Sequence, residues 1–148
     1  DLQSLKDKSS VTTLRALLDA IEQHGKPQII HTDNEPIFHR WIFRLASKRL
    51  GIQPQRTALH SPWQNGRIER FFGTLKAKLD RLIVNDRDAL NEALGIFRFW
   101  YNEMRPHQHL QGRTPNEVWH GIDVYRRRIR RCVEYEAWSG LLQGECLY

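Results

Sequence analysis

Two acidic residues and one lysine are spaced in this chain so that they could form a metal-dependent site. Asp33 follows a short apolar segment that predicts a strand, and Glu69, after 35 intervening residues, begins a predicted helix. Lys76 follows Glu69 by seven residues, so the helical repeat puts both on one face. Carboxylates are suitable Mg²⁺ ligands, and two such ions can activate an attacking oxygen and stabilise a leaving one. Such a set of residues could form a site that cuts phosphodiester bonds.

Each of these three residues also has a plain structural explanation. Asp33 begins an Asp-Asn-Glu-Pro segment, which is good turn chemistry at the end of a strand. Glu69 lies in the first turn of a helix, where an acid complements the helix dipole. Lys76 could be one more solvated lysine. Taken singly, the two acids favour these structural roles, so neighbouring motifs must decide between the alternatives.

Apolar spacing and turn residues predict the elements that would position this site. Helices are expected at 11–25, 36–50, 67–84, 86–105 and 115–120, strands at 28–32 and 52–59, and a loop at 60–66. Residues 132–148 suggest two short strands in a hairpin. The order predicts an α/β layered fold. A sheet of two strands buries a face poorly, so we expect further strands upstream of residue 1.

Composition limits the class of protein. The 148 residues fit one domain, and 40% of them are apolar, enough to supply a core. No segment approaches the length of a membrane span, and no signal-peptide pattern opens the chain. The start lacks a methionine, so we expect the middle of a longer protein. The net charge of +6 is compatible with a nucleic-acid partner or with a basic solvated surface.

A dense basic segment lies near the carboxyl end. Five of the six residues from 126 to 131 are arginines: Arg126, Arg127, Arg128, Arg130 and Arg131. Such a run can follow DNA phosphates without reading the base sequence. Alternatively, it is a solvated linker before the predicted hairpin.

Four segments of the chain resemble retroviral-type integrases and insertion-sequence transposases, the family with two catalytic aspartates and a glutamate. Residues 31–34 (His-Thr-Asp-Asn) resemble the segment of the second aspartate, and residues 63–76 resemble the glutamate segment nearly throughout. Residues 101–108 resemble the family's "YN..RPH" segment, and residues 114–119 its "TP.E.W" ending. The four matches are in order and at the right distances, over roughly residues 10–122.

The resemblance implies a ribonuclease-H-like three-layer α/β fold without its first strands, followed by a small carboxyl-terminal β-hairpin. It also implies Mg²⁺ or Mn²⁺ as cofactor and DNA strand transfer as the reaction. Asp33 and Glu69 match the second and third metal-binding catalytic acids. The DNA contacts that we expect outside the arginine run are Lys76, Gln64, Asn65 and Arg67. One departure is Glu35, where relatives usually have glycine; its charge could hinder an approaching phosphate, or it could point away.

The first aspartate of the family has no counterpart, since Asp1 and Asp7 lie too close to Asp33. We therefore expect residues 1–122 to be a partial catalytic core, and 123–148 a basic linker with the hairpin. Three functions stay open: a fragment of a transposing or integrating enzyme, inactive alone; a non-catalytic DNA-binding or assembly remnant; and a ribonuclease-H-like nuclease. The expected partners are DNA (transposon ends and target) and further copies of the chain, at the bacterial nucleoid in the cytoplasm, without a membrane.

Overall fold

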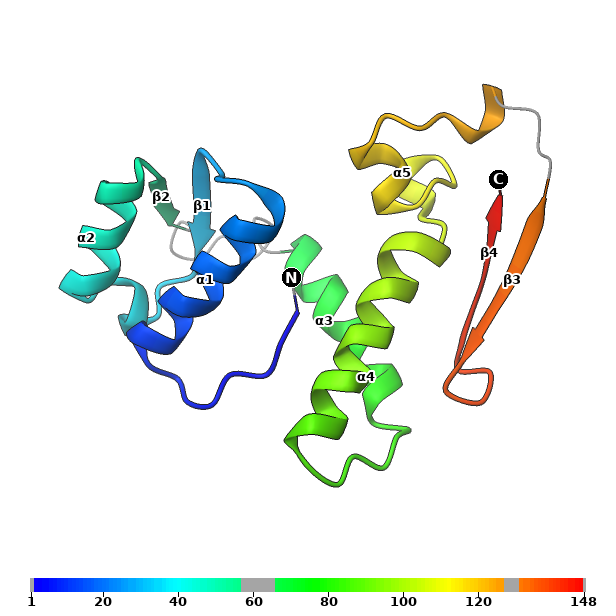
Figure 1. Cartoon of the computed structure of the whole chain (residues 1–148), viewed down its shortest axis with the longest axis horizontal. Coiled ribbons are helices and arrows are strands. Elements are labelled where there is room, and N and C mark those ends of the chain that lie inside the picture. The colour runs from blue at the N-terminus through cyan, green and yellow to red at the C-terminus, as the bar shows by residue number, and fades with distance from the viewer. Residues whose placement is uncertain (1, 57–65, 127–130, 148) are drawn as a thin grey trace. The chain divides into compact units, whose positions relative to one another are not determined.

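The computed structural model describes residues 2–56, 66–126 and 131–147. The chain divides into two compact units. Leu5–Thr74 forms one unit, and Asp1–Ser4 together with Leu75–Tyr148 forms the other. Figure 1 shows the helices and strands of both units. Among the described residues, no helix is both long and apolar enough to cross a membrane.

The Leu5–Thr74 unit is built around a small parallel sheet. Strand β1 (Ile29–Thr32) pairs with β2 (Gln53–Arg56) in a register that sets residue 29 opposite 53 and residue 32 opposite 56. A parallel pair requires a crossover connection. A 3₁₀ helix (Pro36–Phe38) and helix α2 (Trp41–Leu50) supply that connection.

Helix α1 (Ser10–His24) belongs to the same unit and has clear end signals. The Ser9 hydroxyl accepts the backbone N–H of Thr12 at 3.2 Å, as a helix N-cap does. Gly25, at φ 85°, ends the helix. The core of the unit is small, with Phe43 and Ile52 nearly inaccessible to solvent.

The strands of this sheet are more exposed than the sequence suggests. Ile29 in β1 keeps 45% of its surface accessible, and all four residues of β2 are exposed. The apolar pair Ile29 and Ile30 favours a buried strand before Asp33, but Ile29 is exposed and Ile30 is only half-buried. The physical reason is that the described chain offers these two strands no third strand to cover them.

Helix α3 (Gly66–Leu79) is shorter than the predicted helix 67–84. Its end tightens into three-residue turns, in which the N–H groups of Arg81 and Leu82 donate to the carbonyls of Lys78 and Leu79. Such turns commonly close an α-helix. The chain then leaves the helix before reaching Val84.

The Leu75–Tyr148 segment is organised on helix α4 (Arg87–Phe99), whose first turn is capped by Asp86 through the N–H of Ala89 at 2.8 Å. The helix continues into a π-helical turn (Trp100–Met104) and is followed by the short helix α5 (Pro115–Trp119). The core of this unit includes Phe97, which is completely buried, and its neighbours Leu94, Trp100 and Met104.

The predicted carboxyl-terminal hairpin is confirmed. Strands β3 (Cys132–Ala137) and β4 (Leu142–Leu147) pair antiparallel, and Figure 1 shows them beside α4. The indole N–H of Trp100 donates to the carbonyl of Gln143 at 2.7 Å, and the Phe97 and Trp138 rings stack with centroids 6.3 Å apart. The hairpin is thus packed on the π-helical turn.

Candidate active site

Asp33 directly follows β1, at the carboxyl end of the parallel pair, and its side chain is exposed. Its Oδ1 accepts the backbone N–H of Glu35 at 3.2 Å, so the residue does form the turn that its sequence favours. An ionised carboxylate has about four acceptor positions. One hydrogen bond therefore leaves capacity for a cation at the place where α/β folds bind ligands.

Glu69 lies in the first turn of α3, with an exposed side chain. Arg67 is exposed in the same turn. Both belong to the Leu5–Thr74 unit, as does Asp33. Gln64 and Asn65 fall outside the described residues.

Lys76 is exposed and lies seven residues after Glu69 in the same helix. With 3.6 residues per turn, that spacing returns the chain to nearly the same side of the helix. That Glu69 and Lys76 share one helix, α3, is what the structure shows; their joint role in a site stays a prediction.

Glu35 is held by a residue that the sequence did not single out. The Lys8 ammonium lies 2.6 Å from Glu35 Oε1, in a salt bridge between segments 27 residues apart. The hydrogen bond and charge of Glu35, with a smaller effect from Asp33, raise the pKa of Lys8 above its ordinary value. Lys8 is one of several surface lysines in the sequence, and no local pattern links it to Glu35.

The donor set of this region fits a hard divalent cation. Asp33 and Glu69 both offer carboxylate oxygens, and Mg²⁺ keeps several waters while using one or two carboxylates plus substrate phosphates. Within residues 2–56, 66–126 and 131–147, no three His, Cys, Asp or Glu side chains cluster as a metal site. The oxygen donors of Asp33 and Glu69 are therefore of the chemical type that Mg²⁺ prefers, and their joint use as ligands stays a prediction.

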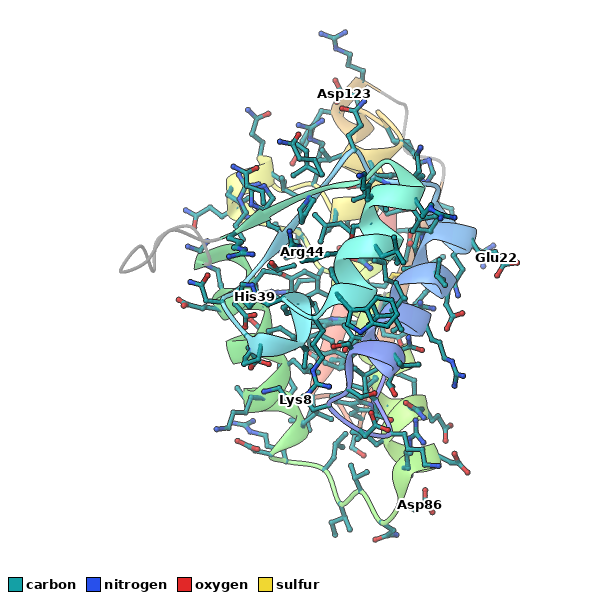
Figure 2. All side chains as sticks on the ribbon, turned by 90° about the vertical axis from the view of Figure 1, so that its left-hand side faces the viewer. Lys8, Glu22, His39, Arg44, Asp86 and Asp123 are labelled. Atoms are coloured by element: carbon teal, nitrogen blue, oxygen red, sulfur yellow. The ribbon has the colours of Figure 1, made fainter. Side chains whose placement is uncertain are left out.

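The two described arginines of the basic run are both exposed. Arg126 ends a 3₁₀ helix and forms a salt bridge at 3.2 Å with Asp123, which is labelled in Figure 2. Arg131 directly precedes β3. Arg127, Arg128 and Arg130 fall outside the described residues.

The "YN..RPH" segment has a structural role in this chain. The Arg105 guanidinium lies over the Trp100 and Tyr101 rings, 5.4 Å from each centroid. His107 keeps 6% of its surface accessible, and its ring lies 4.6 Å from that of Tyr101. Burial lowers the pKa of His107, so the neutral ring is favoured in the fold.

The "TP.E.W" segment is a helix start. The Thr114 hydroxyl accepts the N–H of Glu117 at 3.2 Å, and the Glu117 carboxylate accepts the N–H of Thr114 at 2.7 Å. This capping box opens α5, with Pro115 at its first position. The segment therefore has a structural role as the start of α5.

Comparison with known proteins gives a consistent family. Residues 50–115 match the family described as "Integrase core domain". The chain is 30% identical over 147 residues to a putative transposase InsD of insertion element IS2E from Escherichia coli, covering 94% of the chain and 61% of that protein. It is 30% identical over 118 residues to the Pol polyprotein of a radiation murine leukemia virus, covering 78% of the chain and 19% of that protein. The chain thus spans only part of the length of both relatives.

Retroviral integrases are among the solved structures with the same fold. The simian T-cell lymphotropic virus intasome, solved with PP2A regulatory subunit B56 gamma, aligns at a TM-score of 0.65 and 24% identity, over 96% of this chain and 54% of that one. The HTLV-2 integrase catalytic core, solved with magnesium in a dimeric form, aligns at 0.50 and 27%, over 78% and 70%. The ribonuclease-H-like fold predicted from the sequence is confirmed.

Proposed function

Because the chain carries an integrase core domain and is related to insertion-sequence transposases and retroviral integrases, we propose that it belongs to an enzyme that cuts DNA and transfers the cut strand. The observation that carries this proposal is the position of Asp33 directly after a strand of the parallel pair, in the same unit as Glu69. Ligands of α/β proteins bind beyond the carboxyl ends of such strands.

In this proposal, Asp33 and Glu69 hold Mg²⁺ or Mn²⁺. The bound ion would activate an attacking oxygen and stabilise a leaving oxygen at a DNA phosphate. The magnesium in the HTLV-2 catalytic core supports the choice of cofactor. Both acids are exposed, so a DNA phosphate has access to them.

The cationic residues would position the DNA. Arg67 and Lys76 are exposed on α3 and can contact phosphates. Gln64 and Asn65, which fall outside the described residues, are included in the proposal as further DNA contacts. We assign residues 1–122 to the catalytic core and residues 123–148 to a basic linker with the hairpin. In this proposal the arginines of the linker contact the phosphate backbone of the flanking DNA. Phosphate contacts of this kind fix register and orientation rather than sequence.

The partners that we propose are transposon-end DNA, target DNA and further copies of the chain. The dimeric form of the HTLV-2 core supports self-assembly. Since the related InsD transposases are from Escherichia coli, we place the protein at the bacterial nucleoid in the cytoplasm.

Manganese binding to the 148-residue chain tests the site directly. We expect Asp33→Asn and Glu69→Gln each to weaken Mn²⁺ binding, measured by electron paramagnetic resonance. The loss should be at least about 10-fold, which is what removing even a group that orients a ligand typically costs. Glu22→Gln is the matched control, because Glu22 is an exposed acid of the same unit that projects outward from α1 in Figure 2.

The outcomes separate the candidate functions. Equal loss in all three variants would mean that Mn²⁺ binds the surface non-specifically, and the site would be rejected. DNA binding without any Mn²⁺ site would favour the non-catalytic DNA-binding remnant. In a protein that cuts DNA, strand-transfer products joined to a target duplex distinguish a transposing enzyme from a nuclease.

A further inference from the structure

The turn that carries Asp33 is tied to the start of α1 by two long-range contacts. The Lys8 ammonium pairs with Glu35 at 2.6 Å, and the Ser10 hydroxyl donates to the carbonyl of Ile37 at 2.7 Å. Both contacts join residues 27 positions apart, and Ser10 is buried. Residues 35–37, which follow Asp33, are therefore attached to the start of α1 at two points.

The start of α1 is itself well ordered by hydrogen bonds. Asp7 Oδ1 accepts the N–H of Ser9 at 3.0 Å and the hydroxyl of Thr12 at 2.8 Å. The Ser9 hydroxyl in turn caps the N–H of Thr12. Lys8 lies between Asp7 and Ser9, so its backbone position is fixed even though its side chain is 72% exposed. Figure 2 labels Lys8 at this end of the helix.

Glu35 would present a problem for the proposed site if its carboxylate were unpaired. It follows Asp33 by two residues, and its backbone N–H binds the Asp33 carboxylate. A second negative charge there would repel a DNA phosphate and would offer a metal ion an unproductive ligand. The pairing with Lys8 neutralises that charge and turns the carboxylate toward α1.

We propose that Lys8 is a positioning residue for the Asp33 site, holding Glu35 against α1 so that its charge does not interfere with DNA and metal at Asp33. The inference rests on the proposed function, because it assigns that role to Asp33. The inference requires that Lys8 affects DNA binding through its ion pair with Glu35 and not through a direct contact with DNA.

A double-mutant cycle in DNA binding tests this requirement. Lys8→Met should weaken binding of a labelled duplex by about 2- to 5-fold, the range expected of an exposed ion pair. Glu35→Gln should leave binding unchanged or slightly tighter. The double variant should recover the affinity of the Glu35→Gln protein. Lys6→Met is the matched control, since it removes an equal charge from an exposed lysine two residues away.

Two results would overturn the proposal. If Lys8→Met weakens binding equally with Glu35 and with Gln at position 35, Lys8 contacts phosphate directly. If Lys8→Met behaves like Lys6→Met, the ion pair has no effect on the site.

Amide hydrogen exchange separates this inference from the proposed function. In Lys8→Met, the N–H of Glu35 should exchange several-fold faster, because the turn loses one of its two ties; in Lys6→Met the rate should stay unchanged. A parent chain that binds neither DNA nor Mn²⁺ contradicts the proposed function, and the exchange result then still decides whether Lys8 positions the turn. Unchanged exchange in Lys8→Met rejects the positioning role even where DNA binding is intact.

Discussion

Single residues of the family-like segments fall into two groups by their surroundings. Asp33, Glu69 and Lys76 are exposed, whereas His107 and Thr114 are buried in contacts within the fold. A residue that binds a ligand has to be accessible from solvent, while a residue that packs within the fold does not. The exposed group is therefore accessible for the proposed chemistry, and the buried group makes contacts within the fold.

His107 should make stability depend on pH. Burial lowers its pKa, so the unfolded chain binds more protons than the folded chain below the ordinary value of 6.5. Stability is therefore fully present above pH 6.5 and is lost as the pH falls toward the folded pKa. The nearby positive charges of Arg105 and His109 act in the same direction, while the contact with the Tyr101 carbonyl opposes them.

Urea unfolding at pH 7.5 and pH 5.5 measures this dependence. We expect the parent to lose more stability on acidification than His107→Gln, whatever the stability of the variant at pH 7.5. Gln108→Ala is the control, because it removes an exposed side chain beside His107 without removing a titratable group. An identical acid sensitivity in parent and His107→Gln would contradict the assignment.

At the scale of elements, the contact between the π-helical turn and β4 depends on one glycine. A Cβ built on Gly144 would press on the carbonyl oxygen and backbone of Met104. Gly144→Ala should therefore displace the hairpin and destabilise the fold by about 1–3 kcal/mol, as overpacking commonly does. Gly95→Ala, in α4 with nothing within 4 Å of the new Cβ, should instead be neutral or stabilise by up to about 1 kcal/mol. Chemical denaturation of both variants compares them, and equal stabilities would mean that the hairpin is not docked there.

The β1 edge should promote self-association. β1 pairs only with β2 among the described strands, and Ile29 exposes 45% of its surface. Unpaired edges with apolar side chains recruit further strands. We expect the chain to associate at micromolar concentration, and Ile29→Lys to reduce this, in sedimentation or sizing experiments. Leu18→Lys, on the exposed side of α1, should have a smaller effect; a parent that stays a monodisperse monomer would refute the prediction.

For the whole molecule, DNA binding should be dominated by phosphate contacts. The net charge is +6, and the arginine run offers charge without an evident base-reading element. Replacing Arg126, Arg127 and Arg128 by alanine should weaken binding to unrelated sequences equally. It should also flatten the slope of log K against log salt by up to about three units. If affinity and slope stay as in the parent, the run is a solvated linker, and the contacts revert to Lys76 and the segment around Gln64.

The 148-residue chain on its own should cut DNA poorly or not at all. Asp33 and Glu69 supply two carboxylates, and two-metal phosphoryl transfer needs more negative ligands to offset the repulsion between the ions. Incubation with magnesium or manganese and a labelled duplex measures cutting. Robust cleavage that Asp33→Asn abolishes would show that a further acid within this chain completes the site.

The sequence by itself determined the local elements and the identity of the candidate acids. The hairpin strands near the carboxyl end and most helix positions follow from patterns within a few residues, because capping and side-chain periodicity are local interactions. The same is true of Asp33 after its strand and Glu69 at its helix start. The motifs and their spacing also led to the resemblance to integrases and transposases, and from there to the ribonuclease-H-like fold.

Only the tertiary structure decided which of these residues are exposed and what each one contacts. The pairing of Lys8 with Glu35, the burial of His107 and the close approach of Gly144 to Met104 join residues that are not neighbours in any local pattern. The exposure of β1 depends on how many strands lie beside it, and the strand's own sequence does not contain that number. Such contacts arise when whole elements pack, so the free energy that fixes them comes from nonlocal burial and pairing rather than from local propensity.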